Sequence, residues 1–228
     1  MQSAVTLEAF WAQRLGCTES AFAVAGPTLV PHPRGHSLYA FATASSLVVM
    51  APPELHEAVR RLGQPRALVT REGAQALGVP IARLVGPARI AYLHRSVTGV
   101  FEVVALESAR DARLQRLRDA VAPEEWRHAN LEAAVGPLFA VEAGGEVAAA
   151  AGWERLLDAV AHVGVLAHPG FRGRGLARRA VQAASAAAQA CGLLPQYQTL
   201  ASNEPALAIA AALGFQPFAT TLSADFAA

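Results

Sequence analysis

The sequence contains no lysine and little charge of either sign. Charged residues make up 16% of the 228 positions, below the roughly 25% typical of soluble domains. The formal net charge is +1, whereas nucleic-acid binding usually shows as a clustered basic surface. We therefore expect no nucleic-acid partner.

Cysteine is also scarce, because the chain has only Cys17 and Cys191. Two thiols are too few for a disulfide framework, and residues 1–16 lack the basic leader of a signal peptide. The uncharged stretches 181–203 and 205–224 are interrupted by glycine, proline and glutamine, so neither predicts a membrane span of about 20 apolar residues. We expect a cytoplasmic protein with no membrane partner.

Small apolar residues are abundant instead, with 52 alanines in a chain that is 53% apolar. A chain of this length can bury on the order of 70% of its unfolded surface, which predicts a folded core. The low net charge and high apolar content argue against disorder.

The pattern of apolar residues divides the chain into residues 1–100 and 101–228. In the first region, helices are predicted at 6–15, 54–62 and 73–78, and strands at 37–50, 67–70 and 88–93. In the second, strands are predicted at 100–106, 138–142, 147–153, 159–167, 194–201 and 215–222, and helices at 109–121, 124–135, 176–190 and 203–214. The first region contains no catalytic motif, and its scattered histidines predict no metal site.

The segment 165–177, VLAHPGFRGRGLA, carries the chemistry of the second region. It is a strand that enters a loop with Gly170, Gly173 and Gly175 and continues directly into a helix. Glycines let successive backbone N–H groups converge, and the helix adds its positive N-terminal end. Such a loop binds a pyrophosphate or a similar anion. Nearby positive charge comes from Arg172, Arg174, Arg178 and Arg179.

Three interpretations of this loop compete. A P-loop requires Gly-Lys-Ser/Thr, and a chain without lysine excludes it. A dinucleotide-binding loop places the bulky Arg178 where a small residue belongs, and the next acid is Glu204. The dinucleotide interpretation leaves a nicotinamide-dependent oxidoreductase as an alternative function, which binding of NAD(P) in place of coenzyme A would distinguish. The third is the pattern Arg/Gln-x-x-Gly-x-Gly/Ala, met by Arg172, Gly175 and Ala177.

The stretch 202–215, SNEPALAIAAALGF, favours the third interpretation. Together with the loop, the strand before it and Pro169, it resembles the GNAT superfamily of N-acetyltransferases over about residues 101–228. The resemblance implies an α/β (α+β) fold with a mixed, mostly antiparallel sheet and helices on both faces. Residues 1–100 then form an additional α/β region.

The resemblance further implies acetyl-CoA as cosubstrate and direct transfer of its acetyl group to a primary amine of a small molecule or peptide. The pantetheine arm lies in a V-shaped slot between strands 159–167 and 194–201, bonded to the backbone near Leu166 and Ala167 and contacted by Asn203. The pyrophosphate is held by the loop residues Arg172, Gly173, Arg174, Gly175, Leu176 and Ala177.

Two positions depart from the family pattern. Ala210 replaces a tyrosine that often protonates the leaving thiolate, and Gln198 replaces a glutamate base of some members. Candidates for the missing proton transfer are His162, Tyr197 and Glu154, with Asp158 as a further possible base. His168 is expected only to support the loop.

The losses at Ala210 and Gln198 keep open a catalytically weak acyl-CoA-binding regulatory protein. Three roles stay open for residues 1–100: completing the acceptor pocket, forming a degenerate copy of the same fold, or making a homodimer contact. The acceptor also stays open among aminoglycosides, polyamines, amino acids and protein N-termini.

Overall fold

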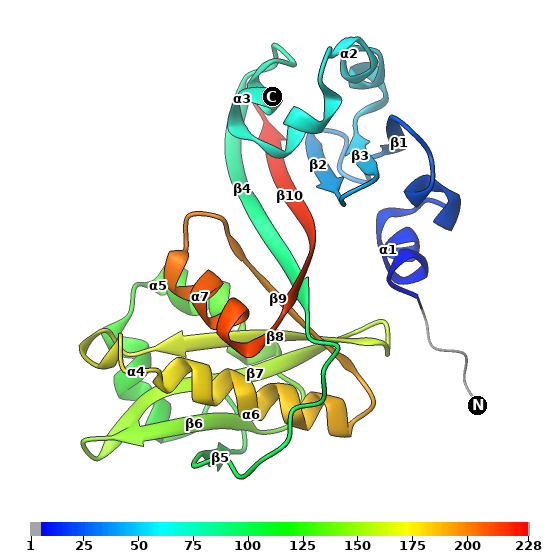
Figure 1. Cartoon of the computed structure of the whole chain (residues 1–228). Helices are drawn as coiled ribbons and strands as arrows, with labels where there is room; N and C mark the ends of the chain where they lie inside the picture. Colours follow the sequence, from blue (N-terminus) through cyan, green and yellow to red (C-terminus); the bar gives the residue numbers. More distant parts are fainter. Residues whose placement is uncertain (1–5, 228) are drawn as a thin grey trace. The chain divides into compact units, whose positions relative to one another are not determined.

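The computed structural model describes residues 6–227, whose helices and strands are labelled in Figure 1. These residues divide into two compact units. The first holds the described residues up to Ile90, the segment Thr199–Glu204 and the described residues from Pro217 onward. The second holds Ala91–Gln198 and Pro205–Gln216. The units do not follow one boundary in the sequence, and the separate role expected for residues 1–100 stays a prediction.

The first unit combines strands with short helices. Its strand β2 (Ser37–Ala42) pairs antiparallel with β3 (Leu47–Ala51) and with β10 (Gln216–Phe226), and β1 (Pro27–Pro31) pairs parallel with β3. Its helices are α1 (Leu7–Leu15), α2 (His56–Arg61) and α3 (Arg71–Gln75). Apolar side chains from β2, β3, β10 and both later helices share one core.

Two details of the first unit differ from the sequence prediction. Residues 67–70 are not a strand, because Pro65–Val69 forms a 3-10 helix that leads into α3. The Thr70 hydroxyl accepts the Gly73 N–H at 3.1 Å and thereby caps α3. The sequence prediction contained no strand at β1, which has proline at both of its ends.

The second unit is built on a mixed sheet, as predicted. Its neighbouring strands are β9 (Leu194–Leu200), β8 (Val160–Ala167), β7 (Glu146–Leu156), β6 (Leu138–Ala143) and β5 (Val104–Leu106). Only β8 and β9 pair parallel, and the other neighbours pair antiparallel. Strand β4 (Ile81–Tyr92) lies next to β9, where the Leu93 N–H donates to the Pro195 carbonyl at 3.0 Å.

Helices pack on both faces of this sheet, which confirms the predicted fold class. On one face, α6 (Leu176–Ala190) and α7 (Glu204–Leu213) share a core with side chains of β7, β8 and β9. On the other, α4 (Gln115–Ala120) and α5 (Pro123–Ala129) form a second core with β6 and β7. No helix among residues 6–227 is long and apolar enough to cross a membrane.

The close approach of α6 depends on small residues. Its buried side chains include Ala180, Val181, Ala184 and Ala188, each 0% exposed. Small side chains let a helix axis approach a sheet closely. These residues therefore form the face of α6 that packs on the sheet.

Helix α5 lies directly on the backbone of β8. A Cβ atom added to Gly164 would stand 1.9 Å from the Ala129 carbonyl oxygen, so only glycine fits there. The helix ends at Asn130, whose φ of 50° is left-handed, rather than continuing to residue 135 as predicted. Asparagine tolerates this conformation and commonly ends helices.

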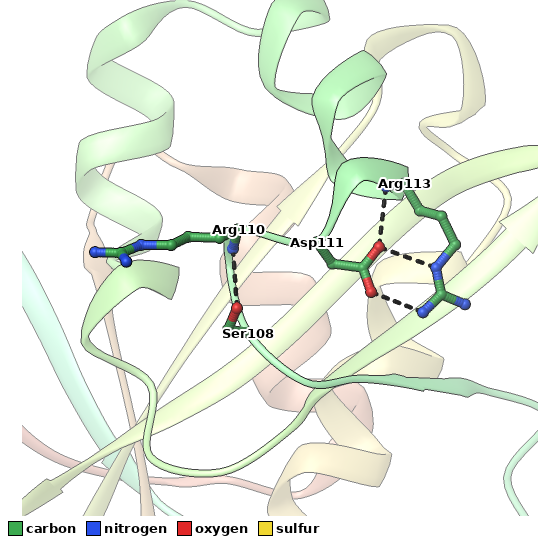
Figure 2. Close-up of polar contacts among 4 residues, drawn as sticks. All are labelled: Ser108, Arg110, Asp111 and Arg113. Atoms are coloured by element: carbon green, nitrogen blue, oxygen red, sulfur yellow. Dashed lines mark hydrogen bonds and ion pairs between the residues drawn. The ribbon is translucent and has the colours of Figure 1, made fainter.

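A local polar cluster caps the 3-10 segment Ala112–Leu114, which leads into α4 (Figure 2). Asp111 Oδ1 accepts the Arg113 N–H at 3.0 Å, and both carboxylate oxygens accept from the Arg113 guanidinium. These bonds from Arg113 lower the pKa of Asp111 to about 2. The helical segment therefore begins at Ala112, later than the predicted residue 109. Strand β5 is likewise shorter than the predicted 100–106.

Candidate functional site

A strand, a glycine loop and a long helix follow one another in the second unit, as the sequence predicts. Strand β8 ends at Ala167, and α6 begins at Leu176 (Figure 1). Between them, His168 Nδ1 accepts the Gly170 N–H at 3.1 Å. The His168 ring also packs edge-on against the Phe171 ring, with 5.3 Å between the ring centroids. His168 therefore supports the loop, as expected.

The loop uses glycine where its backbone is left-handed. Gly173 has φ 79° and Gly175 has φ 74°, conformations that side chains disfavour. Gly175 is also the N-cap of α6 and has no side chain to bond the first turn. The first N–H groups of a helix lack partners inside the helix, and they carry its partial positive charge. The loop and the start of α6 together can hold an anion.

The loop arginines make specific contacts. Arg172 donates from Nη2 to Glu125 Oε2 at 2.6 Å and from Nε to the Ala167 carbonyl at 3.3 Å, which ties the loop to α5 and to the end of β8. Arg174 lies over the Phe171 ring at 5.3 Å. Arg179 pairs with Glu102 at 2.7 Å. Glu125 and Glu102 therefore offset part of the positive charge near the loop.

Strands β8 and β9 separate along their length. Their paired positions run from Val160↔Leu194 to His162↔Gln196, and both strands continue beyond the last pair (Figure 1). The edge of β8 from Val163 to Ala167 therefore faces the opening between the two strands. The predicted V-shaped slot corresponds to this unpaired edge, which leads to the glycine loop.

The pairing of β8 with β9 ends at His162, whose side chain lies on the face of the sheet that carries α5. Ala161 and Val163 belong to the core under α6, so His162 between them points to the opposite face. The same alternation places Tyr92 and Gln196 on that face. In the register of β7 and β8, Glu154 lies directly opposite His162.

These side chains form a line of polar groups across neighbouring strands, which we name the polar row: Tyr92, Gln196, His162 and Glu154. Gln196 donates from Nε2 to Tyr92 Oη at 2.8 Å, and its Oε1 lies 3.2 Å from His162 Nδ1. Glu154 Oε2 accepts from Asn130 Nδ2 at 3.1 Å. The structure therefore brings together two of the predicted catalytic candidates, His162 and Glu154.

The third candidate, Tyr197, does not join them. Its side chain is 4% exposed and packs in the core under α6, with its ring 5.5 Å from that of Phe215. Burial raises the pKa of Tyr197 to about 12. The expectation that it serves the slot is wrong, because alternation along β9 directs Gln196, not Tyr197, to the face of His162.

Asp158 is also away from the slot. It has φ 53° in the turn that precedes β8, at the opposite end of that strand from the glycine loop. It is 87% exposed and pairs with Arg155 at 3.5 Å. Its role is that of a turn residue, and the suggestion that it acts as a base is not supported.

Leu166 and Asn203, also predicted to bind the cofactor, differ in exposure. Leu166 buries its side chain among residues of α4 and α5, so only its backbone can serve a ligand. Asn203 is exposed, belongs to the first unit, and donates its N–H to the Leu200 carbonyl at 3.0 Å. Its contact with pantetheine stays a prediction. Among residues 6–227, no group of His, Cys, Asp or Glu side chains could hold a metal ion.

Sequence reasoning missed Gln196, Tyr92 and Glu125. The signal for Gln196 was its place between Pro195 and Tyr197 in a predicted strand, because a polar side chain that a strand buries needs partners. Nothing in the sequence links Tyr92 to it, since they are 104 positions apart.

Comparisons with known proteins agree with this architecture. The profile of the acetyltransferase (GNAT) family matches residues 103–215, and the chain belongs to this family through the domain that those residues form. Comparison with curated proteins finds no match to the chain.

Two solved structures show the same fold. A protein of the GNAT family from Novosphingobium aromaticivorans is 28% identical, with a TM-score of 0.52 over 66% of this chain and 69% of that one. A GNAT-family acetyltransferase from Colwellia psychrerythraea is 16% identical, with a TM-score of 0.52 over 83% of this chain and 65% of that one. The second similarity is one of fold alone.

Proposed function

We propose that this protein is an acetyl-CoA-dependent N-acetyltransferase that transfers the acetyl group directly to a primary amine of a small molecule or peptide. The observation that carries the proposal is the junction of the open β8 edge with the left-handed glycines and the uncapped start of α6. Family membership supports the reaction class.

The loop fits the pyrophosphate of coenzyme A. Backbone N–H groups from Gly173 to Ala177 lie before and within the first turn of α6, where the helix dipole favours negative charge. Glu125 holds the Arg172 side chain against the loop, so this arginine shapes the site while the amides bind.

The β8 edge fits the pantetheine arm. Its backbone between Val163 and Ala167 can bond an extended chain as a neighbouring strand would. A backbone N–H of this edge would polarise the thioester carbonyl and stabilise the negative charge that develops on its oxygen. The thioester would then lie near His162, where the strands begin to separate.

In this proposal, the proton of the amine is assigned to His162 and Glu154. Alkyl amines have an ordinary pKa near about 10.4, so a base is needed as the new C–N bond forms. His162 takes that proton in our proposal, and the Glu154 carboxylate opposite it stabilises the resulting imidazolium. Coenzyme A leaves as a thiolate, which an ordinary thiol pKa near about 8.5 allows.

A pair of matched glycine variants tests the loop. Gly173 (φ 79°) and Gly192 (φ 75°) stand near opposite ends of α6, and a Cβ added to either meets nothing within 4 Å. Alanine therefore imposes the same backbone strain at both positions. We expect Gly173→Ala to weaken acetyl-CoA binding at least roughly 10-fold in calorimetry, and Gly192→Ala to leave it unchanged.

The pyrophosphate itself is tested with acetyl-pantetheine, which lacks it. The wild type should bind acetyl-CoA more tightly than acetyl-pantetheine, and Gly173→Ala should reduce that difference. Equal affinities of the wild type for both compounds, or no binding at millimolar acetyl-CoA, would contradict the proposal.

A catalytically weak acyl-CoA-binding regulatory protein is the second candidate. It is favoured by Ala210, which is 7% exposed within an apolar core and offers no proton donor. This function predicts acetyl-CoA binding without thiol release across polyamines, aminoglycosides, amino acids and peptides. Thiol release with any of these amines would exclude it.

A further inference from the structure

A fully buried glutamine connects the catalytic candidate to a tyrosine. Gln196 is 1% exposed, and both ends of its amide are used: Nε2 donates to Tyr92 Oη at 2.8 Å, and Oε1 lies 3.2 Å from His162 Nδ1. An apolar side chain of similar size could fill this place without requiring partners. The hydrogen bonds of its amide therefore explain why a glutamine occupies this position in the polar row.

The direction of these bonds determines where the histidine proton lies. An amide oxygen can only accept hydrogen bonds, so His162 Nδ1 must be the donor to Gln196 Oε1. A neutral imidazole carries one N–H, so its lone pair is then on Nε2. The bond made by one ring nitrogen thus selects the tautomer.

Tyr92 fixes the orientation of the amide. It is 0% exposed, and its Oη accepts the Gln196 NH2 group. With the NH2 group held there, the amide oxygen faces His162. A rotated amide would present NH2 to Nδ1 and favour the opposite tautomer, with the proton on Nε2.

We propose that Gln196, held by Tyr92, is a positioning residue that fixes His162 as the Nδ1–H tautomer and so makes Nε2 the base for the acceptor amine. This inference rests on the proposed function. The amine nitrogen bonds to the thioester carbon, its proton passes to Nε2, and the C–S bond breaks with its electron pair on sulfur. The imidazolium then returns the proton to the thiolate, giving amide and free thiol.

One histidine in the same chain supplies an internal reference. His168 Nδ1 accepts the Gly170 N–H, so its own proton lies on Nε2. The structure thus predicts opposite tautomers for His162 and His168. Imidazole-nitrogen NMR of the isotope-labelled full-length chain distinguishes them, with His162→Asn used to assign the signals.

The first arm of the test needs no ligand. We expect wild-type His162 as Nδ1–H, and we expect Gln196→Met to shift it toward Nε2–H while His168 does not change. Tyr92→Phe should cause a smaller shift in the same direction. Gln196→Glu should restore Nδ1–H, since a carboxylate also accepts from Nδ1. An Nε2–H wild type, or a Gln196→Met tautomer equal to that of the wild type, would overturn the proposal.

The second arm measures thiol release from acetyl-CoA with spermidine, tyramine, an aminoglycoside and a dipeptide. We expect Gln196→Met to lower kcat roughly 10- to 100-fold with little change in the KM for acetyl-CoA, and Gln196→Glu to recover most of it. Gln13→Met makes the same chemical change at an exposed site and should have no effect. Wild-type kcat in Gln196→Met overturns this inference alone, whereas absence of acetyl-CoA binding overturns the proposed function. If no amine reacts, the NMR measurement of the His162 tautomer alone supports or overturns the inference.

Discussion

The two faces of the sheet in the second unit are built from different kinds of side chain. Under α6, alanines and other apolar residues pack closely around Tyr197 and Phe215. On the face of α5, the polar row crosses neighbouring strands, and Gln196 bonds to residues on either side. The comparison teaches that one face holds the helix that presents the loop, while the other carries groups able to move a proton.

The same alternation along each strand produces both faces. In β9, Tyr197 enters the apolar core while the adjacent Gln196 enters the polar row. In β8, Val163 and His162 divide in the same way. A shift of one residue in register would exchange the faces and remove the site.

The largest effect on stability is expected when a bulky side chain is introduced into the apolar core under α6. Ala184 is 0% exposed in the core under α6, so Ala184→Phe should push the helix from the sheet and lower the free energy of unfolding by about 3 kcal/mol or more. Urea unfolding measures this change. Ala190→Phe, at an exposed position of the same helix, is the control and should have little effect. Equal unfolding midpoints for the wild type and Ala184→Phe would contradict the burial of this face of α6 against the sheet.

A smaller effect on the free energy of unfolding is expected when the pH is raised, because Tyr197 lies buried in the apolar core. Burial raises the pKa of Tyr197 to about 12, whereas tyrosine in an unfolded chain titrates near about 10. Between these values only the unfolded state loses the proton, so stability is complete below about pH 10 and falls by about 2 to 3 kcal/mol by about pH 12.

Unfolding of the wild type and of Tyr197→Phe across this pH window isolates the contribution. Burial also raises the pKa of Tyr39, so the wild type retains a slope from that residue and only the difference between the chains counts. Parallel pH profiles would show that Tyr197 is accessible to water, contrary to the proposed separation of the faces.

The smallest effect sharpens the contrast between the faces. Ser185 Oγ in α6 has no hydrogen-bond partner among the described residues, although it is fully buried. Ser185→Ala should therefore leave stability unchanged or raise it by about 1 kcal/mol in thermal unfolding. Gln196→Met, which removes bonded polar atoms from the other face, should lower it. A clear loss of stability in Ser185→Ala would reveal a partner for the hydroxyl.

Local signals made the loop and the main elements predictable. The loop glycines at 173 and 175 and the helix 176–190 are each read from adjacent residues, and the structure confirms them. The strand expected at 67–70 was wrong because Pro65 starts a 3-10 helix there. The helix expected to reach residue 135 was wrong because Asn130 turns left-handed.

The polar row could be predicted only in part. His162 and Glu154 were candidates by chemistry, but their register depends on the pairing of β7 with β8. Tyr92 meets Gln196 only through the neighbouring positions of β4 and β9, which no local pattern specifies. Tyr197 was misplaced for the same reason, because the face of a residue depends on which neighbours its strand acquires.

We propose above all that backbone N–H groups at the start of α6 bind the phosphates of acetyl-CoA. The most direct test of this proposal is an amide NMR titration of the full chain with acetyl-CoA. We expect the signals of Gly173, Gly175, Leu176 and Ala177 to move together with those of the β8 edge, while that of Gly192 stays in place. Saturation with acetyl-CoA that shifts other amides and leaves these unmoved would contradict it.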